Sequence, residues 1–160
     1  MMEEKIIIEI LDKEQIDLLK PLWEQLRDYH QKHSRHFADR FKFFTFETRK
    51  ESLLKTDTLH LLVAKHRSSK VGYCISSLEE NEGNIESLYL KPQFRKAGIG
   101  KRLFLESLEW LESKGVDSIS VTVAAGNEPV LEFYRHYGFE VSTIKMKTIR
   151  NRKGECNDSI

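Results

Sequence analysis

The 160-residue sequence lacks the features of a membrane protein, a disulfide-bonded secreted protein or a nucleic-acid-binding protein. No apolar run approaches the roughly 20 residues that a membrane-spanning helix needs, and the acidic start "MMEEKIIIEIL" is unlike a signal peptide. Its two cysteines, Cys74 and Cys156, lie far apart and show no CxxC spacing. The 26 basic and 25 acidic residues leave a net charge of +1, so no overall field attracts nucleic acid or membrane. These absences predict a reduced, cytoplasmic globular protein.

The periodicity of the apolar residues predicts a single α+β domain over residues 1–150, followed by a polar tail, 151–160, without regular structure. Three strands with short connections, expected at 59–66, 70–79 and 85–91, form an antiparallel meander. Further strands are expected at 5–11 and 117–124, and a strand or strand pair at 139–149 closes the core. Helices are expected at 13–32, with an interruption at Pro21, and at 46–55, 98–114 and 127–137. The predicted fold is a mixed, mostly antiparallel central sheet flanked by helices.

The stretch "YLKPQFRKAGIGKRLFLE" places a basic, glycine-containing loop between a strand and a helix. Glycines allow the backbone to approach a phosphate group closely, and the first N–H groups of the helix point toward it. Two common phosphate-binding patterns do not match. In a P-loop, Arg95 would have to be glycine and Arg102 would have to be serine or threonine, and in a dinucleotide-binding fingerprint Leu103 would have to be glycine.

The pattern that does match is Arg-x-x-Gly-x-Gly, formed by Arg95, Gly98 and Gly100. It resembles the acetyl-CoA-binding motif of the GNAT superfamily of N-acetyltransferases. About 30 residues further on, "SISVTVAAGNEPVLEFYRHYGFE" is similar to the fifth strand and terminal helix of that family. The resemblance implies transfer of an acetyl group from acetyl-CoA to a primary amine of a small molecule or peptide, directly within a ternary complex and without a metal.

The resemblance also implies which residues bind the cofactor and which carry the chemistry. The backbone groups of Leu88, Tyr89 and Leu90, in the strand before the loop, are expected to pair with the pantetheine arm. The loop is expected to bind the pyrophosphate through Arg95, Lys96, Ala97, Gly98, Ile99, Gly100 and Lys101. Asn127 is expected to hydrogen-bond the cofactor. Glu86 is expected to accept the amine proton, directly or through water, and Tyr134 to bind the cofactor and protonate the leaving thiolate. A phenol of pKa about 10 is protonated at neutral pH and can donate to a thiolate.

Each of these residues also has a structural alternative. Glu86 could be a solvated charge near the start of a strand, and Tyr134 could be a core aromatic like Tyr137. Asn127 is well suited to cap a helix. Cys74 lies in an apolar alternation and is expected in the core, and neither cysteine lies near the motifs, which argues against an acetyl-cysteine route.

Two polar clusters outside the motifs are open to more than one interpretation. His30, His33 and His36 could lie on one side of a helix, but their spacing is not that of a zinc enzyme, so they are expected to line the acceptor pocket or to be solvated. The acidic cluster Glu79, Glu80 and Glu82 is either a hydrophilic turn or an attraction for a cationic acceptor such as a polyamine.

The sequence leaves the acceptor open among antibiotic, polyamine, amino acid and peptide N-terminus. A homodimer formed through a sheet edge or C-terminal strands is compatible with the resemblance. A non-catalytic acyl-CoA-binding module and a nucleic-acid-binding domain that uses the basic loop are the alternatives from other classes.

Overall fold

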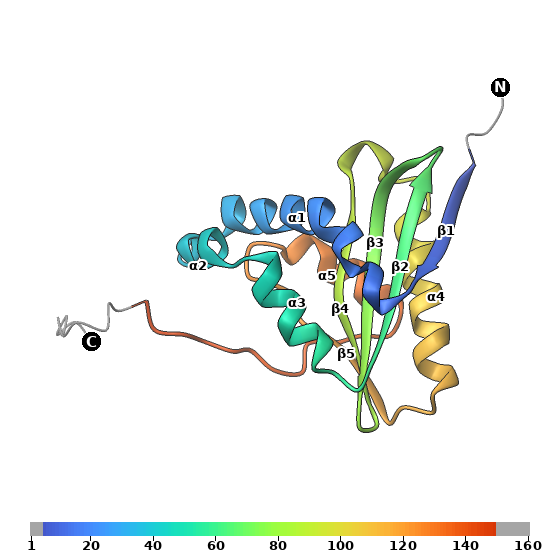
Figure 1. Ribbon diagram of the computed structural model, residues 1–160. Helices are drawn as coiled ribbons and strands as arrows, with labels where there is room; N and C mark the ends of the chain where they lie inside the picture. The colour runs from blue at the N-terminus through green and yellow to red at the C-terminus, as the bar shows by residue number, and fades with distance from the viewer. Residues whose placement is uncertain (1–4, 150–160) are drawn as a thin grey trace, which may run out of the picture.

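The computed structural model describes residues 5–149, which form a five-stranded sheet with the strand order β1-β2-β3-β4-β5. The strands are β1 (Ile6–Leu11), β2 (Thr58–His66), β3 (Ser69–Glu79), β4 (Glu82–Leu90) and β5 (Ser118–Val121). The α-helices are α1 (Lys20–His33), α2 (Ala38–Phe43), α3 (Phe46–Leu54), α4 (Ile99–Ser113) and α5 (Leu131–His136), and the 3-10 helices are η1 (Lys13–Leu19), η2 (Pro92–Phe94) and η3 (Glu128–Val130). Figure 1 shows α1 and α3 on one side of the sheet and α4 on the other. The predicted fold class is confirmed.

Strands β1 to β4 pair antiparallel with their neighbours, so the predicted meander is confirmed. The turns between its strands are tight, and Arg67 and Glu80 take the left-handed conformation there, with φ of 57° and 52°. Because only Glu80 and Asn81 form the second turn, β4 begins at Glu82 rather than at the expected Ile85.

Strand β5 is parallel to β4, and the two strands pair only over a short stretch. The pairing runs from Glu82 opposite Ser118 to Ile85 opposite Val121. Beyond Ile85, β4 continues to Leu90 beside β3, but no described strand pairs with its other edge. The N–H and C=O groups on that edge of β4 are therefore left for another partner.

The sheet separates two hydrophobic cores. On one face, η1, α1 and α3 bury apolar residues against the sheet, among them Leu19, Trp23 and Phe46. On the other face, α4 and α5 pack against residues such as Cys74, which is fully buried as expected. Because each face of the sheet is covered by helices, the middle residues of β2 and β3 are buried on both faces, and the site has to form at an edge or an end of the sheet.

The helices largely follow the predicted pattern. Pro21 lies in the first turn of α1, so the expected interruption separates η1 from a new helix. The stretch Ala38–Phe43, where no helix was predicted, forms the short helix α2. None of the helices within residues 5–149 is long and apolar enough to cross a membrane.

The expected strand or strand pair at 139–149 is not formed. After Gly138, whose φ is 87°, the chain runs extended and away from the body of the protein, as Figure 1 shows in orange-red. Its apolar residues Val141, Ile144 and Met146 are exposed. The prediction was wrong because strand propensity is satisfied only where a partner strand supplies the hydrogen bonds, and no strand of the described residues pairs with this segment. The polar tail predicted for 151–160 lies outside the described residues.

Candidate active site

The loop between β4 and α4 has the geometry of a phosphate cradle. Lys96 and Gly98 both take the left-handed conformation, with φ of 70° and 81°, and α4 begins at Ile99. A Cβ atom added at Gly98 or Gly100 would meet no other atom within 4 Å. The space in front of these two residues is therefore open, and the first-turn N–H groups of the 15-residue helix α4, which have no acceptor within the helix, border it.

The basic side chains of the loop divide into two kinds. Arg95 donates from Nε to the Leu90 carbonyl at 2.9 Å, and Arg102 donates to the Ile6 carbonyl at 3.3 Å. Both arginine side chains therefore form hydrogen bonds with the backbone of the protein. Lys96 and Lys101 are exposed and form no hydrogen bond or ion pair with another residue in the 5–149 range. These two lysines, and the loop's N–H groups, can meet the charge of a diphosphate.

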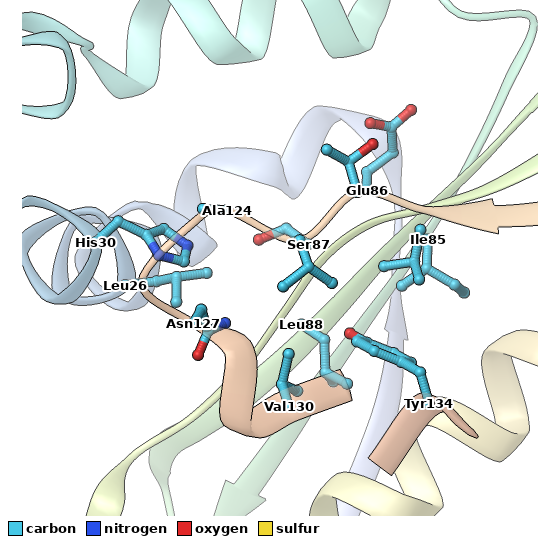
Figure 2. A pocket seen from close by; sticks show the side chains of 13 residues that line it. Leu26, His30, Ile85, Glu86, Ser87, Leu88, Ala124, Asn127, Val130 and Tyr134 are labelled. Carbon is cyan, nitrogen blue, oxygen red and sulfur yellow. The ribbon is translucent and has the colours of Figure 1, made fainter. Parts of the chain in front are cut away.

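A hollow lies where β4 and β5 part, and it brings together residues that are far apart in the sequence. Glu86, Leu88, Asn127 and Tyr134 all line it, as Figure 2 shows. The sequence-predicted base and acid therefore border one space, between β4 and α5. Tyr89 and Leu90 do not line this hollow and lie further along β4, toward the glycine loop.

Glu86 occupies a β-bulge. The register between β3 and β4 changes from Ile75 opposite Ser87 to Ser76 opposite Ile85, so Glu86 is the extra residue. A bulge re-aims a side chain that would otherwise follow the alternation of the strand. Sequence patterns could not have located it, because the alternation of β4 is disturbed only at this one position.

The carboxylate of Glu86 is held by two donors. Arg49 Nη2 donates to Oε2 at 2.7 Å, and Ser77 Oγ donates to Oε1 at 2.6 Å. Arg49 also contacts the Glu86 carbonyl oxygen at 3.3 Å, and both side chains of the ion pair are only about a fifth exposed, at 22% and 20%. Neither Arg49 nor Ser77 was predicted from the sequence, since no motif or spacing connects α3 and β3 with Glu86.

Tyr134 is buried among aromatic side chains on α5. Its ring lies 5.6 Å from that of Phe104 and 6.0 Å from that of Phe139, and the residue is 7% exposed. Burial, and to a smaller extent Cys74, raises the pKa of the Tyr134 phenol far above its usual range. The hydroxyl forms no hydrogen bond with any described residue and borders the hollow, so it is a protonated donor available to a ligand.

Asn127 is the N-terminal flanking residue of η3, but its side chain makes no capping hydrogen bond. Asn127 thus has the position of a helix cap but does not make the capping hydrogen bond, and its side chain lines the hollow instead. The neighbouring Gly126, with φ of 99°, packs so tightly against the His33 carbonyl that a Cβ atom would collide with it. This contact places the loop before η3 against the end of α1.

A second hollow adjoins the first and shares Leu26, His30, Glu86 and Ser87 with it. Its other lining residues come from α1, α2, α3 and the residues between them: Trp23, Arg27, Phe41, Phe44 and Arg49. The aromatic residues on and beside α2 were not predicted to contribute, because no helix was predicted in that segment.

The three histidines of the predicted cluster diverge. His30 lines both hollows, His33 stacks on Tyr29 at 4.0 Å and donates from Nδ1 to the Tyr29 carbonyl, and His36 lies beside Phe37. Across residues 5–149, no group of three or more potential metal ligands comes together. The acidic cluster Glu79, Glu80 and Glu82 lies at the β3–β4 turn and lines neither hollow.

Comparisons with known proteins agree with this geometry. The model of the acetyltransferase (GNAT) family matches residues 18–139. A [ribosomal protein bS18]-alanine N-acetyltransferase of Salmonella typhimurium is 26% identical over 73 residues, which cover 46% of this chain and 49% of that protein. A spermidine N(1)-acetyltransferase of Thermoplasma acidophilum is 31% identical over 74 residues, which cover 46% of each chain. The matched part thus spans about half the length of these curated relatives.

The solved structures show the same fold. The aminoglycoside N-acetyltransferase AAC(6')-Iy in complex with CoA superposes with a TM-score of 0.66 at 19% identity, over 94% of this chain and 97% of that one. At this identity the likeness concerns the fold. Because the family model covers most of the chain, including the glycine loop, both strands that border the first hollow and α5, the chain belongs to the acetyltransferase (GNAT) family.

Proposed function

We propose that the protein transfers an acetyl group from acetyl-CoA to a primary amine, directly within a ternary complex. The observation that carries this proposal is the first hollow, where β4 and β5 part. Glu86 and Tyr134 border it from two elements, and β4 leads from it to the glycine loop. A thioester placed there would have a carboxylate on one side and a phenol on the other.

Acetyl-CoA fits the residues present along β4. The open space at Gly98 and Gly100, together with Lys96 and Lys101, suits the pyrophosphate. Leu88, Tyr89 and Leu90 have no strand partner on the β5 side, so the backbone groups that point to that side can pair with the pantetheine amides. The Leu90 carbonyl is the exception, because it already accepts from Arg95. Asn127 also lines the first hollow, which supports its proposed hydrogen bond with the cofactor.

The proposed chemistry needs two proton transfers. The amine nitrogen forms a bond to the thioester carbon and loses a proton to Glu86, directly or through water. The C–S bond then breaks, and the leaving thiolate takes a proton from the Tyr134 hydroxyl. The raised pKa keeps that hydroxyl protonated at neutral pH, so the proton is present when the thiolate forms beside it.

A covalent acetyl-cysteine route has less support. Cys74 is fully buried, and burial raises the pKa of its thiol to about 11, so the thiolate needed for attack is scarce at neutral pH. Cys156 lies outside the described residues. The cytoplasmic location expected from the sequence stays a prediction.

We also propose that two copies of the chain associate through the segment 139–149. The segment is extended, exposes Val141, Ile144 and Met146, and pairs with no described strand, while β5 lies at the edge of the sheet. An edge strand and an extended apolar segment that has no described strand beside it can form a new strand pair when exchanged between copies. Light scattering on the full chain and on a chain ending at Phe139 tests this. The full chain is expected to be a dimer and the shortened chain a monomer, and a monomeric full chain would contradict it.

The catalytic proposal is tested by calorimetry with coenzyme A and by release of free thiol from acetyl-CoA in the presence of amines. Binding together with amine-dependent thiol release is expected. Binding without thiol release for any amine would favour the non-catalytic acyl-CoA module, and no heat from coenzyme A would contradict both.

A further inference from the structure

The second hollow decides which kind of amine can approach Glu86. Glu86, Ser87, Leu26 and His30 line both hollows, so the two hollows adjoin at Glu86. If the thioester occupies the first hollow, as proposed above, the acceptor must enter through the second. The charges and side chains of the second hollow therefore set the acceptor's chemistry.

The charge in this hollow is not negative. Among its lining residues Glu86 is the sole carboxylate, and it is already paired with Arg49 at 2.7 Å. Arg27 adds a second guanidinium, 19% exposed, which donates to the Phe44 carbonyl at 3.3 Å. Its carboxylate partners, Glu24 at 3.8 Å and Asp28 at 3.3 Å, do not line the hollow. A second ammonium group on the acceptor would find no unpaired carboxylate here.

His30 adds no positive charge at neutral pH. Burial, and secondarily the nearby His33, lowers the pKa of the His30 imidazole below its usual value of 6.5. The ring is therefore a neutral, partly apolar surface between the two hollows.

The remaining wall is aromatic. The rings of Trp23 and Phe44 meet edge to face at 5.5 Å, and the rings of His30 and Phe41 lie 5.4 Å apart. Trp23 is almost fully buried, while Phe41 and Phe44 are half-buried and keep one side open to the hollow. Such a surface binds a flat or branched apolar group by contact area and by ring geometry.

From these walls we infer that the acceptor is a primary amine with a single positive charge and an apolar, preferably aromatic, body. This inference rests on the proposed acetyl transfer and narrows it. This class of acceptor differs from spermidine and aminoglycosides, the polycations that appear in the names of two similar proteins. The acidic cluster at the β3–β4 turn, which could have attracted a polycation, lies outside both hollows.

The test compares amines that differ in one feature, with thiol release from acetyl-CoA as the readout. n-Hexylamine and 1,6-diaminohexane have the same length but one or two charges, and 2-phenylethylamine adds an aromatic ring. Spermidine and kanamycin represent polycations. The expected kcat/KM is highest for 2-phenylethylamine and about tenfold or more lower for the diamine than for n-hexylamine. An equal or higher value for the diamine, spermidine or kanamycin would overturn the inference.

Two variants of α2 isolate the aromatic wall. Phe41→Ala removes a ring that lines the hollow, whereas Phe43→Ala removes a ring from the same helix that is 74% exposed and lines neither hollow. Phe41→Ala is expected to lower kcat/KM for 2-phenylethylamine by about tenfold and to affect n-hexylamine less. Phe43→Ala is expected to change neither value. Equal effects of the two variants would contradict the assignment of this wall.

A variant of Arg27 isolates the charge. Arg27→Glu is expected to raise the kcat/KM ratio of 1,6-diaminohexane to n-hexylamine, and Arg27→Gln to raise it less. An unchanged ratio in Arg27→Glu, with coenzyme A still bound and the circular dichroism spectrum retained, would contradict the charge argument.

Failure of the inference and failure of the proposed function give different results. A protein that binds coenzyme A and acetylates polycations, or that acetylates none of these amines, would overturn the acceptor class and leave acetyl-CoA binding intact. A protein that gives no heat with coenzyme A would overturn the proposed function itself.

Discussion

Arg49 on α3 holds Glu86 on β4 through a 2.7 Å ion pair and a second contact with the Glu86 backbone carbonyl. The partners are 37 residues apart in the sequence, and the bulge at Glu86 turns the carboxylate toward α3. Arg49 therefore positions the proposed base.

Arg49→Gln is expected to lower kcat/KM for an accepted amine by about tenfold or more, because the carboxylate loses its fixed position. The dissociation constant of coenzyme A should not change, since Arg49 lies away from the glycine loop. Lys50→Gln is the matched control, because Lys50 pairs with the exposed Asp17 at 2.9 Å and lines neither hollow. An equal loss in both variants would indicate a merely structural role for Arg49.

Glu86→Gln tests the base itself. The amide keeps the size of the side chain but cannot accept a proton, so the acidic limb of the pH–rate profile is expected to shift or disappear. Coenzyme A binding, measured by calorimetry, should be retained. A variant whose acidic limb matches that of the unaltered protein would place the base at another residue.

Tyr134→Phe removes only the proposed donor. The hydroxyl has no hydrogen-bond partner among the described residues, so the free energy of unfolding should change little. Turnover is expected to fall on the order of 100-fold, and coenzyme A affinity by much less. Tyr137→Phe is the control, because Tyr137 packs on Phe104 at 5.0 Å from the same end of α5 and does not line the first hollow. Equal turnover in the Tyr134→Phe variant and the unaltered protein would remove the acid assignment.

Gly100→Ala separates stability from binding. Gly100 lies in the first turn of α4 without a positive φ, and a Cβ atom there meets no protein atom within 4 Å. Alanine should therefore stabilise the fold by about 0.5–1 kcal/mol, measured by denaturant unfolding, while weakening coenzyme A about tenfold because the methyl group fills the cradle. Gly115→Ala is expected to destabilise instead, because Gly115 has φ of 68°. Unchanged coenzyme A affinity in Gly100→Ala would contradict the cradle.

His60 makes stability depend on pH. Its ring stacks on Trp110 at 4.6 Å, and burial, with a smaller effect of Lys114, lowers the pKa of the imidazole below 6.5. The unfolded chain therefore binds a proton at a higher pH than the folded one. This contribution to stability is present above about pH 6.5 and is lost as the pH falls through the lowered folded pKa. His60→Gln should flatten this part of the stability curve, and an unchanged slope would contradict it.

Much of the fold was predictable because the elements carry local signals. The alternation in 59–91 predicted the meander, and the apolar stripe of 98–114 predicted α4. The segment 139–149 has a similar alternation, yet it forms no strand, because alternation describes a strand's two faces and does not provide a neighbour. Helix α2 was missed because its six residues are too few to show a clear period.

The amino-acid sequence by itself determined the antiparallel meander, helix α4, the glycine loop and the two motifs, since turn glycines, periodicity and residue spacing are local properties of the chain. Only the tertiary structure decided the pairing of Glu86 with Arg49 and Ser77, the hollow beside Tyr134 and the aromatic wall of the acceptor side. These contacts and hollows bring together residues of α1, α2, α3, β3, β4 and α5. The position of Glu86 and the first hollow depend on where β4 bulges and where β5 stops pairing. Neither event leaves a mark in the sequence, because both result from how the strands and helices pack together.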